Sequence, residues 1–457
     1  MLPIGSQADA EAELAATFRG QILKPMDAGY EDARKVHNGL VDKRPALIAR
    51  CHGVADVVGA LDVTRRLGLE VAVRGGGHNV AGRATIDDGV VVDLSPMKGI
   101  HADPESRTVW AQGGVTWGEL NRETQLHGLA VTGGVVSSTG IAGLTLGGGV
   151  GWLMGKYGLA LDNLRAVDLV TADGKVLRAS KDREPELFWA LRGGGGNFGV
   201  ATSFEYELHP VGPTIMGGPI VHPIDRARAL LEFFRDIAPS LSDEQTLYAT
   251  LTHAPDGSGK EVAALVASHC GSLEDAESAM RPLKQFAHPI VDAVGPIPYC
   301  QLNRMLDANF PKGALNYWKS SFLTELSDAA IDAMIRCFAR CPTTKGQLLL
   351  EHFHGAVTRV DVSDTAFPHR REGYNFLVLA QWMQPEESRA CVAWARETYE
   401  EMQPFFAAGR YVNYLDDDDT GEPIAAYGPN YRRLQQIKAR YDPTNFFHMN
   451  QNIRPLA

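Results

Sequence analysis

Apolar residues in the first quarter of the chain recur at spacings that distinguish helices from strands. Between residues 54 and 67 they fall at helical intervals, at Val54, Val57, Val58 and Leu61, which predicts an amphipathic helix. Short apolar runs stand on either side of it, and such runs are typical of strands. We therefore predict strands at residues 46–50, 70–74, 90–93 and 108–112.

Local signals mark further elements before residue 210. Thr116 is followed three residues later by Glu119, a capping-box pattern that predicts the start of a helix. The dipeptide Asp173-Gly174 separates apolar runs at 164–171 and 176–178, which predicts a β-hairpin. Periodicity also predicts a helix over 185–192 and a strand over 200–208.

The pattern changes after Pro210, where strand-like segments begin to alternate with long amphipathic segments. The predicted strands are residues 245–253, 261–269, 347–354 and 375–382. The predicted helices are residues 225–237, 273–286, 328–340 and 385–402, with a last helix over 429–441. This order predicts a second domain with a mostly antiparallel sheet covered by helices.

Composition and charge narrow the class of protein. The chain has 457 residues, 44% of them hydrophobic, which is enough for two domains. Its net charge of −11 argues against binding to nucleic acid or to an anionic membrane. No apolar run is long enough to cross a membrane, and residues 1–13 lack the basic start of a secretory signal. The six cysteines are scattered, and Cys337 and Cys341 are interpreted as unlinked thiols. These features favour a reducing cytoplasm.

Three glycine clusters are the main chemical signal. The strand at 70–74 ends in Arg74, three glycines and His78, and two more clusters follow at 147–149 and 193–196. Glycine-rich turns let backbone N–H groups approach a phosphate closely, so together the clusters indicate a large phosphate-bearing cofactor. The third cluster matches G-x-G-x-x-G formally, but a helix precedes it and a strand follows, the reverse of the dinucleotide-binding order. No P-loop sequence occurs.

These clusters resemble the motifs of a known family, the FAD-linked oxidases with a PCMH-type domain. Segment 74–79, Arg-Gly-Gly-Gly-His-Asn, is similar to the first FAD motif. Segments 133–163 and 192–200 are similar to the second and third. Segments 411–414, Tyr-Val-Asn-Tyr, and 441–447 resemble the closing part of berberine-bridge-type enzymes.

The resemblance implies an α+β fold with two domains, a PCMH-type FAD-binding domain and an antiparallel-sheet substrate domain. The implied division is 1–210 for the FAD domain, 211–405 for the substrate domain, and 406–457 for a segment that returns to the FAD domain. It also implies FAD as cofactor, bound covalently through His78. Val136 stands where members with a second link carry cysteine, so a single link is expected, and Thr139 aligns with a position linked to oxygen access. The residues implied to bind FAD are Arg74, Gly75, Gly76, Gly77, His78, Asn79, Gly82, Gly134, Val135, Ser138, Thr139, Gly140, Gly143, Gly148, Gly149, Gly151, Asn197, Gly199, Val200, Asn413 and Asn450.

Oxidation by a flavin needs a base for the substrate's O–H or N–H proton. Tyr414 is the first candidate and Tyr411 the second, and a neighbouring charge would have to lower the tyrosine pKa. Some members carry a carboxylate where this chain has Asn375, so a glutamate mechanism is in doubt and Asn375 is a candidate substrate contact. No metal site is expected.

Two other features remain open at the level of sequence. His352 and His354 share one face of a strand, either in the pocket or on the surface. The acidic run 416–419 is interpreted as a solvated loop.

The sequence therefore predicts an FAD-dependent oxidoreductase that removes hydride from a small alcohol, amine or secondary metabolite. Its expected partners are a small-molecule substrate and molecular oxygen, with no nucleic acid and no membrane, in a monomer or homodimer. The alternatives are a flavin dehydrogenase with another acceptor, or a flavin-bearing binding protein without turnover.

Overall fold

The computed structural model describes residues 14–419 and 423–456. A small sheet of four strands lies at the N-terminal end, in the order β1 (Gln21–Leu23), β2 (Leu47–Arg50), β4 (Val90–Asp93), β3 (Val71–Arg74). Strands β2 and β3 run parallel to β4, and helix α3 (Val54–Leu67) connects β2 to β3. Gly68 ends this helix at φ 65°, a left-handed conformation that glycine adopts without steric cost.

A middle sheet of five strands follows, in the order β5 (Ile100–Asp103), β6 (Thr108–Gln112), β10 (Val200–Glu207), β8 (Leu164–Val170), β9 (Val176–Ser180). The predicted hairpin is confirmed, because β8 and β9 pair antiparallel around Asp173-Gly174. The predicted capping box is also confirmed: Thr116 N donates to Glu119 Oε2 at 2.8 Å and begins α4 (Trp117–Thr124). The other helices here are α2 (Tyr30–Arg34), α5 (Ile141–Gly147), α6 (Met154–Tyr157) and α7 (Pro185–Leu191).

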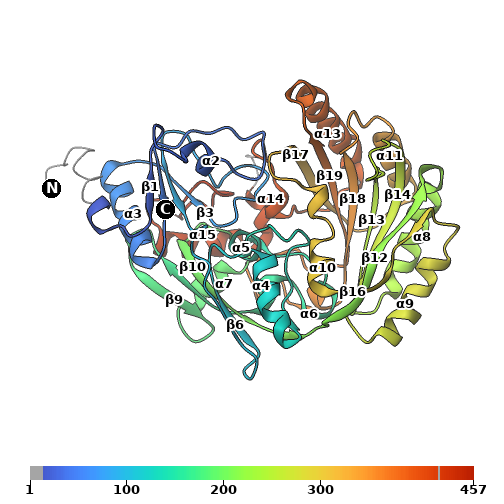
Figure 1. The fold of residues 1–457 in the computed structure, drawn as a ribbon, viewed down its shortest axis with the longest axis horizontal. Helices are drawn as coiled ribbons and strands as arrows, with labels where there is room; N and C mark the ends of the chain where they lie inside the picture. Colours follow the sequence, from blue (N-terminus) through green and yellow to red (C-terminus); the bar gives the residue numbers. More distant parts are fainter. Residues whose placement is uncertain (1–13, 420–422, 457) are drawn as a thin grey trace.

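A large antiparallel sheet of eight strands forms the other half of the molecule (Figure 1). Its main path is β15 (Val291–Asp292), β12 (Thr214–Pro223), β14 (Glu261–His269), β13 (Gln245–His253), β18 (Gln347–Phe353), β19 (Gly373–Trp382), β17 (Leu315–Leu323), and β16 (Gly295–Pro298) also pairs with β12. The sequence patterns missed β12 and β17, whose polar and glycine residues hide the alternation.

Helices cover one face of the large sheet, as predicted. They are α8 (Ala227–Ile237), α9 (Leu273–Gln285), α11 (Asp328–Phe338) and α13 (Ser388–Met402), at the outer side of the molecule in Figure 1. Their apolar faces and the sheet bury one continuous core, which includes Leu230, Phe234, Met334, Phe376 and Trp394. The opposite face of the large sheet is left to line a cavity. Two short helices, α10 (Tyr299–Arg304) and α12 (Ala356–Arg359), lie in its connections.

The C-terminal segment returns to the first half of the chain. Helices α14 (Pro423–Tyr427) and α15 (Tyr431–Tyr441) follow the large sheet in sequence, and Leu434 and Ile437 share a core with Phe188 and Phe198. Lys438 is fully buried in a salt bridge with Asp442 at 2.6 Å. This bridge anchors the last helix next to the third glycine cluster, because Lys438 Nζ also donates to Asn197 O at 2.6 Å.

Several features of the described residues bear on the compositional predictions. None of their helices is long and apolar enough to cross a membrane, and they contain no cluster of metal-ligating side chains. Cys337 lies in α11, Cys341 lies just beyond it, and all six cysteines are free. The prediction that residues 1–13 carry no secretory signal lies outside the described residues.

The interpretation of residues 416–419 as a solvated loop is wrong for two of the four aspartates. Asp416 is 6% exposed and accepts a hydrogen bond from Trp318 N at 3.0 Å. Asp419 forms salt bridges of 2.8 Å with Lys319 and with Arg410. Lys319, a hundred residues away in the chain, and Arg410, nine residues away, thus neutralise a carboxylate that was expected to be solvated.

Candidate active site

A cavity of about 610 Å³ lies between the glycine turns of the first half of the chain and the uncovered face of the large sheet. A volume of this order suits a drug-sized ligand or part of a larger cofactor. Many of the residues expected to bind FAD or act on substrate line it. They are Gly75, Gly76, Gly77, His78, Asn79, Gly134, Val135, Thr139, Gly140, Gly143, Gly199, Asn413, Tyr414 and Asn450.

Two of the glycine turns touch each other backbone to backbone. A Cβ on Gly76 would lie 2.4 Å from Gly140 N, and a Cβ on Gly140 would lie 2.5 Å from Gly76 N. Gly77 adopts φ 63°, so the turn before His78 needs glycine for conformation as well as for space. The cavity wall is therefore made of bare backbone here, which leaves room for a ligand to approach its N–H groups.

His78 is the histidine of this turn, and it lines the cavity. Its Nε2 atom is buried and has no hydrogen-bond partner among the described residues. Burial, with a smaller contribution from the nearby His37, lowers the pKa of His78 to about 3. The imidazole is therefore neutral at physiological pH, the state in which a ring nitrogen can act as a nucleophile.

Val136 also lines the cavity and is almost fully buried. None of the six cysteines is among the lining residues in the described part of the chain. The side chains offered for a covalent link to a cofactor therefore include His78 and no thiol.

Other residues expected to bind FAD are not among those that line the cavity. Arg74 is buried and its guanidinium donates to Asp93 at 2.9 Å. Asn197 donates to Gly194 O at 2.9 Å and to Gln451 O at 3.1 Å, which joins the third glycine cluster to the C-terminal segment. The remaining ones outside the lining are Gly82, Ser138, Gly148, Gly149, Gly151 and Val200. The structure does not bring these residues to the cavity surface.

The two candidate tyrosines have different surroundings. Tyr411 is fully buried outside the cavity lining, and its hydroxyl accepts from Gly149 N and Asn413 Nδ2, each at 2.8 Å. Tyr414 lines the cavity and its hydroxyl donates to Glu351 Oε1 at 3.0 Å. Only Tyr414 is therefore placed to contact a bound substrate.

Glu351 is the site residue that the sequence patterns missed. It lies on β18 directly opposite Asn375 of β19, and Asn375 Nδ2 donates to Glu351 Oε2 at 2.8 Å. The interpretation of Asn375 as evidence against a glutamate mechanism is therefore corrected, because the carboxylate stands one strand away. Asn375 holds that carboxylate and is not itself among the cavity-lining residues. In the strand predicted at 347–354, Glu351 occupies a position that faces the interior. That position is the sequence signal by which Glu351 could have been identified as a site residue.

Burial sets the protonation states of Glu351 and Tyr414. Burial raises the pKa of Glu351 to about 7, although the hydrogen bonds from Asn375 and Tyr414 act in the opposite direction. Burial and the Glu351 charge raise the pKa of Tyr414 well above its usual value. The expected lowering of the tyrosine pKa by a neighbouring charge is therefore not found, since the neighbour is an anion. Glu351 is the group of the pair that changes protonation near pH 7.

The uncovered face of the large sheet carries a carboxylate in one row and mostly apolar side chains in the next. The row level with Tyr414 contains Tyr248, Glu351 and Asn375 on adjacent strands. The next row along the strands contains Val221, Ala264, Thr250, Leu349 and Leu377. Among the described residues that line the cavity, Glu351 is the one carboxylate. The wall therefore offers one carboxylate beside a mostly apolar row, and Thr252, His253 and Gln347 add polar side chains beyond that row.

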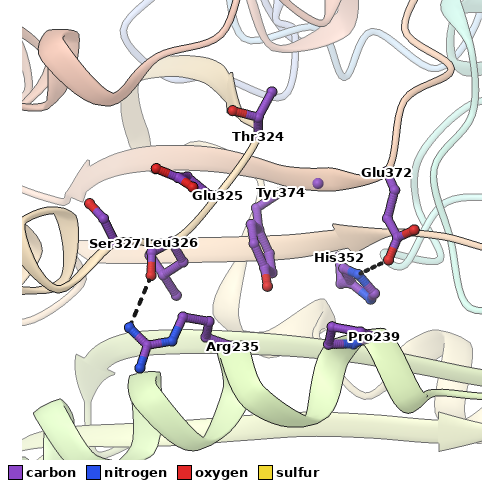
Figure 2. Close-up of a pocket in the computed structure, with 10 residues that line it drawn as sticks. Arg235, Pro239, Thr324, Glu325, Leu326, Ser327, His352, Glu372 and Tyr374 are labelled. Atoms are coloured by element: carbon purple, nitrogen blue, oxygen red, sulfur yellow. Dashed lines mark hydrogen bonds and ion pairs between the residues drawn. The ribbon is translucent and has the colours of Figure 1, made fainter.

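His352 and His354 point away from this cavity. They stack at 4.7 Å between ring centroids on the helix-covered face of the sheet, and they are 2% and 5% exposed. Figure 2 shows His352 beside a second, smaller cavity of about 480 Å³, 3.9 Å from Glu372. None of the residues expected from the sequence to bind FAD lines that second cavity. The two histidines are thus neither surface residues nor part of the candidate active site.

The described residues fit a flavin cofactor on two grounds. The glycine turns line the cavity with backbone atoms, and they pack so closely that a Cβ on Gly76 or Gly140 would collide with the facing turn. A neutral, unpartnered His78 nitrogen stands at the edge of these turns. In addition, a carboxylate and a tyrosine hydroxyl face the same cavity from the large sheet and the closing segment.

Comparison with known proteins also indicates a flavin-binding protein. The family model "FAD binding domain" matches residues 45–180, and the model "Berberine and berberine like" matches residues 410–454. An FAD-linked oxidoreductase of Dictyostelium discoideum is 32% identical over 97% of this chain and 96% of its own length. The (R)-6-hydroxynicotine oxidase of Paenarthrobacter nicotinovorans is 31% identical, over 96% of this chain and 97% of its own. The crystal structure of 6-hydroxy-D-nicotine oxidase from Arthrobacter nicotinovorans superposes with a TM-score of 0.88 at 31% identity, covering 96% of this chain and 99% of that one.

Proposed function

Because the chain belongs to the berberine bridge enzyme-like family of FAD-linked oxidoreductases, we propose that Tyr414 and Glu351 together remove the substrate proton in an FAD-dependent oxidation. The chain is an FAD-dependent oxidoreductase of the two-domain PCMH-type fold. The observation that carries the proposal is the 3.0 Å hydrogen bond from Tyr414 to a cavity-facing Glu351.

The proposed roles follow from the protonation of the pair. The flavin, when bound, accepts a hydride from the carbon that bears the substrate's oxygen or nitrogen. Tyr414 takes the O–H or N–H proton from the substrate while it passes its own proton to Glu351. Because the pKa of Glu351 lies at about 7, the carboxylate is available to receive that proton at neutral pH. Asn375 orients Glu351 by donating to its second oxygen.

We also propose that FAD is attached through His78 alone. Support comes from the neutral, unpartnered imidazole in the cavity wall and from Val136, which offers no sulfur. The glycine turns around Gly76, Gly140 and Gly199 and the side chains of Asn79, Asn413 and Asn450 would hold the cofactor. A tryptic peptide with His78 should then carry the mass of FAD, and no cysteine peptide should.

The substrate proposed for this cavity is a small, largely apolar alcohol or amine with its reacting group at the Glu351 end. The apolar row that contains Leu349 and Leu377 supports it, since unpaired sugar hydroxyls buried there would be costly. Molecular oxygen as the acceptor, a cytoplasmic location, a role in secondary metabolism, a monomeric or homodimeric state and the domain limits 1–210, 211–405 and 406–457 stay predictions.

Anaerobic stopped-flow mixing with a substrate that bleaches the flavin tests the roles of the pair. Tyr414→Phe and Glu351→Gln should each slow flavin reduction by about 10²–10⁴-fold, the usual cost of losing a general base. Tyr411→Phe should slow it less, and Tyr157→Phe, outside the cavity, should leave it unchanged. Wild-type rates in both pair variants, with flavin content intact, would remove the role from these residues. Rapid reoxidation of the reduced wild type in air would identify an oxidase, and slow reoxidation a dehydrogenase.

A further inference from the structure

A second histidine lies directly against the proposed attachment residue. The rings of His37 and His78 stack with their centroids 3.8 Å apart and their planes 23° apart. His78 lines the cavity, whereas His37 does not. His37 therefore covers a face of the His78 ring without taking up space in the cavity.

The backbone holds His37 in this position from both sides. His37 N donates to Gly77 O at 2.9 Å, and His37 O accepts from Gly313 N at 2.9 Å. The next residue, Asn38, is buried and donates through Nδ2 to Val80 O at 2.7 Å. The segment that carries His37 is thus tied to the turn that carries His78 and to the connection that leads into β17.

The charge state of the two rings is compatible with nucleophilic attack by His78. Burial, with a smaller contribution from Lys312, lowers the pKa of His37 to about 4. Burial lowers the pKa of His78 to about 3, with His37 as the next contribution. Both rings are neutral at pH 7, so a lone pair is available and the stack carries no charge repulsion.

We propose that His37 is a positioning residue for flavin attachment, whose ring fixes the plane of His78 so that its nucleophilic nitrogen points at the cofactor. The proposal rests on the covalent link at His78 proposed above. A single χ2 rotation would otherwise turn the ring, and misplacement of a reacting atom by about 1 Å can cost about a hundredfold in rate.

The attachment step balances without any further protein group. Attachment would break a C–H bond of the flavin 8α-methyl group and the imidazole N–H bond and form an N–C bond. The flavin would take up the two electrons together with one of the two protons and release the other proton to solvent. Oxygen or another two-electron acceptor would then remove the electrons and the remaining proton. The contribution of His37 is only the orientation of the attacking ring.

Three substitutions separate ring stacking from simple filling of space. His37→Phe keeps a flat ring, His37→Leu fills much of the volume without one, and His37→Ala removes the side chain. His101→Ala, at an exposed histidine of β5, is the matched control. Each holoprotein is purified, its total flavin is measured by absorbance, and the covalent share is measured by intact mass and by flavin retained after acid denaturation.

We expect the ratio of covalent to released flavin to fall by about tenfold or more in His37→Leu and His37→Ala. His37→Phe should stay close to the wild type and to His101→Ala, with the covalent mass mapped to the His78 peptide. Equal covalent ratios in His37→Phe and His37→Leu overturn the proposal, even if His37→Ala does not fold. A wild type that releases all its flavin on denaturation overturns the His78 link itself, whereas a covalent wild type with unaffected variants overturns only the role of His37.

Discussion

Glu351 is a buried carboxylate whose two oxygens each accept a hydrogen bond from a neutral group, Asn375 and Tyr414. No salt bridge to Glu351 is found among the described residues, in contrast to Asp93, which pairs with Arg74. Neutral donors stabilise the anion less than a guanidinium does, so burial prevails and the pKa rises to about 7. A proton acceptor with this pKa is suited to work at neutral pH.

The protonation of Glu351 predicts the pH dependence of flavin reduction. The base is available only as the carboxylate, so the rate should rise as pH increases through about 7 and level off above it. Glu351→Gln should lose this rise, which stopped-flow measurement between pH 5 and 9 would detect. An unchanged pH profile in Glu351→Gln would assign the titration to another group.

The same pKa shift has a consequence for stability with a defined sign. Because burial raises the folded-state pKa of Glu351 above 4.5, the folded protein binds this proton more tightly than the unfolded chain does. The contribution of Glu351 to the free energy of unfolding is therefore present at low pH and is lost as pH rises through about 7. Thermal unfolding of Glu351→Gln should show less loss of stability across this range than the wild type.

At the scale of elements, the closing segment from Tyr411 to Asp419 brings the two halves of the site together. Tyr411 fixes one end of it to Gly149 in the first half of the chain. Asp419 fixes the other end through Lys319 of β17. Tyr414 lies between these anchors, so its position next to Glu351 depends on both.

Removal of the Lys319 anchor should loosen this segment. Lys319 is buried, with 7% of its side chain exposed, and pairs with both Asp418 and Asp419. Lys319→Met leaves carboxylates without this partner and should cost about 1–3 kcal/mol of unfolding free energy. Flavin reduction should slow as well, because Tyr414 is held less firmly. Thermal unfolding and stopped-flow reduction measure the two effects.

Arg396→Met is the matched control for that substitution. Arg396 is 53% exposed and pairs with the same Asp418 at 2.9 Å, and exposed pairs contribute about 0–1 kcal/mol. Equal losses in Lys319→Met and Arg396→Met would show that burial of the lysine anchor does not matter.

At the scale of the whole molecule, the cavity exists because one face of the large sheet is left without helices. The glycine turns of the first half close over that face, and the cavity-facing strand residues become its wall. The row next to Glu351 is aliphatic apart from Thr250, and Thr252 and Gln347 are among the few polar side chains beyond it. Discrimination between substrates is therefore expected from apolar contact rather than from hydrogen bonds.

A substrate panel tests this expectation. N-methylbenzylamine and cyclohexylmethanol should bleach the flavin, whereas glucose and cellobiose at the same concentration should not. Leu377→Ala should weaken the binding of the apolar substrates by about 2–3 kcal/mol through lost contact. This loss would appear as a higher KM with a smaller change in kcat. Val176→Ala, at an exposed valine of β9, should have no effect. Faster reduction by the sugars would refute the apolar assignment.

From the sequence by itself the local elements, the glycine turns, the candidate residue His78 and the family could be recognised. Each of these depends on short-range periodicity, turn chemistry or contiguous motifs. Helix α3 and strands β4, β6, β13 and β14 have the predicted bounds, and the capping box and the hairpin formed where expected. The predicted domain limits and the roles of the site residues remain predictions.

Only the tertiary structure decided which of these residues share the cavity. Glu351, Asn375 and Tyr414 lie on separate segments and meet through antiparallel register and a returning tail. The same long-range pairing buries Arg74 against Asp93, neutralises Asp419 with Lys319, and turns His352 to the other face of the sheet. A linear pattern cannot show such contacts, since a side chain's partners and burial are set by residues far away in the chain.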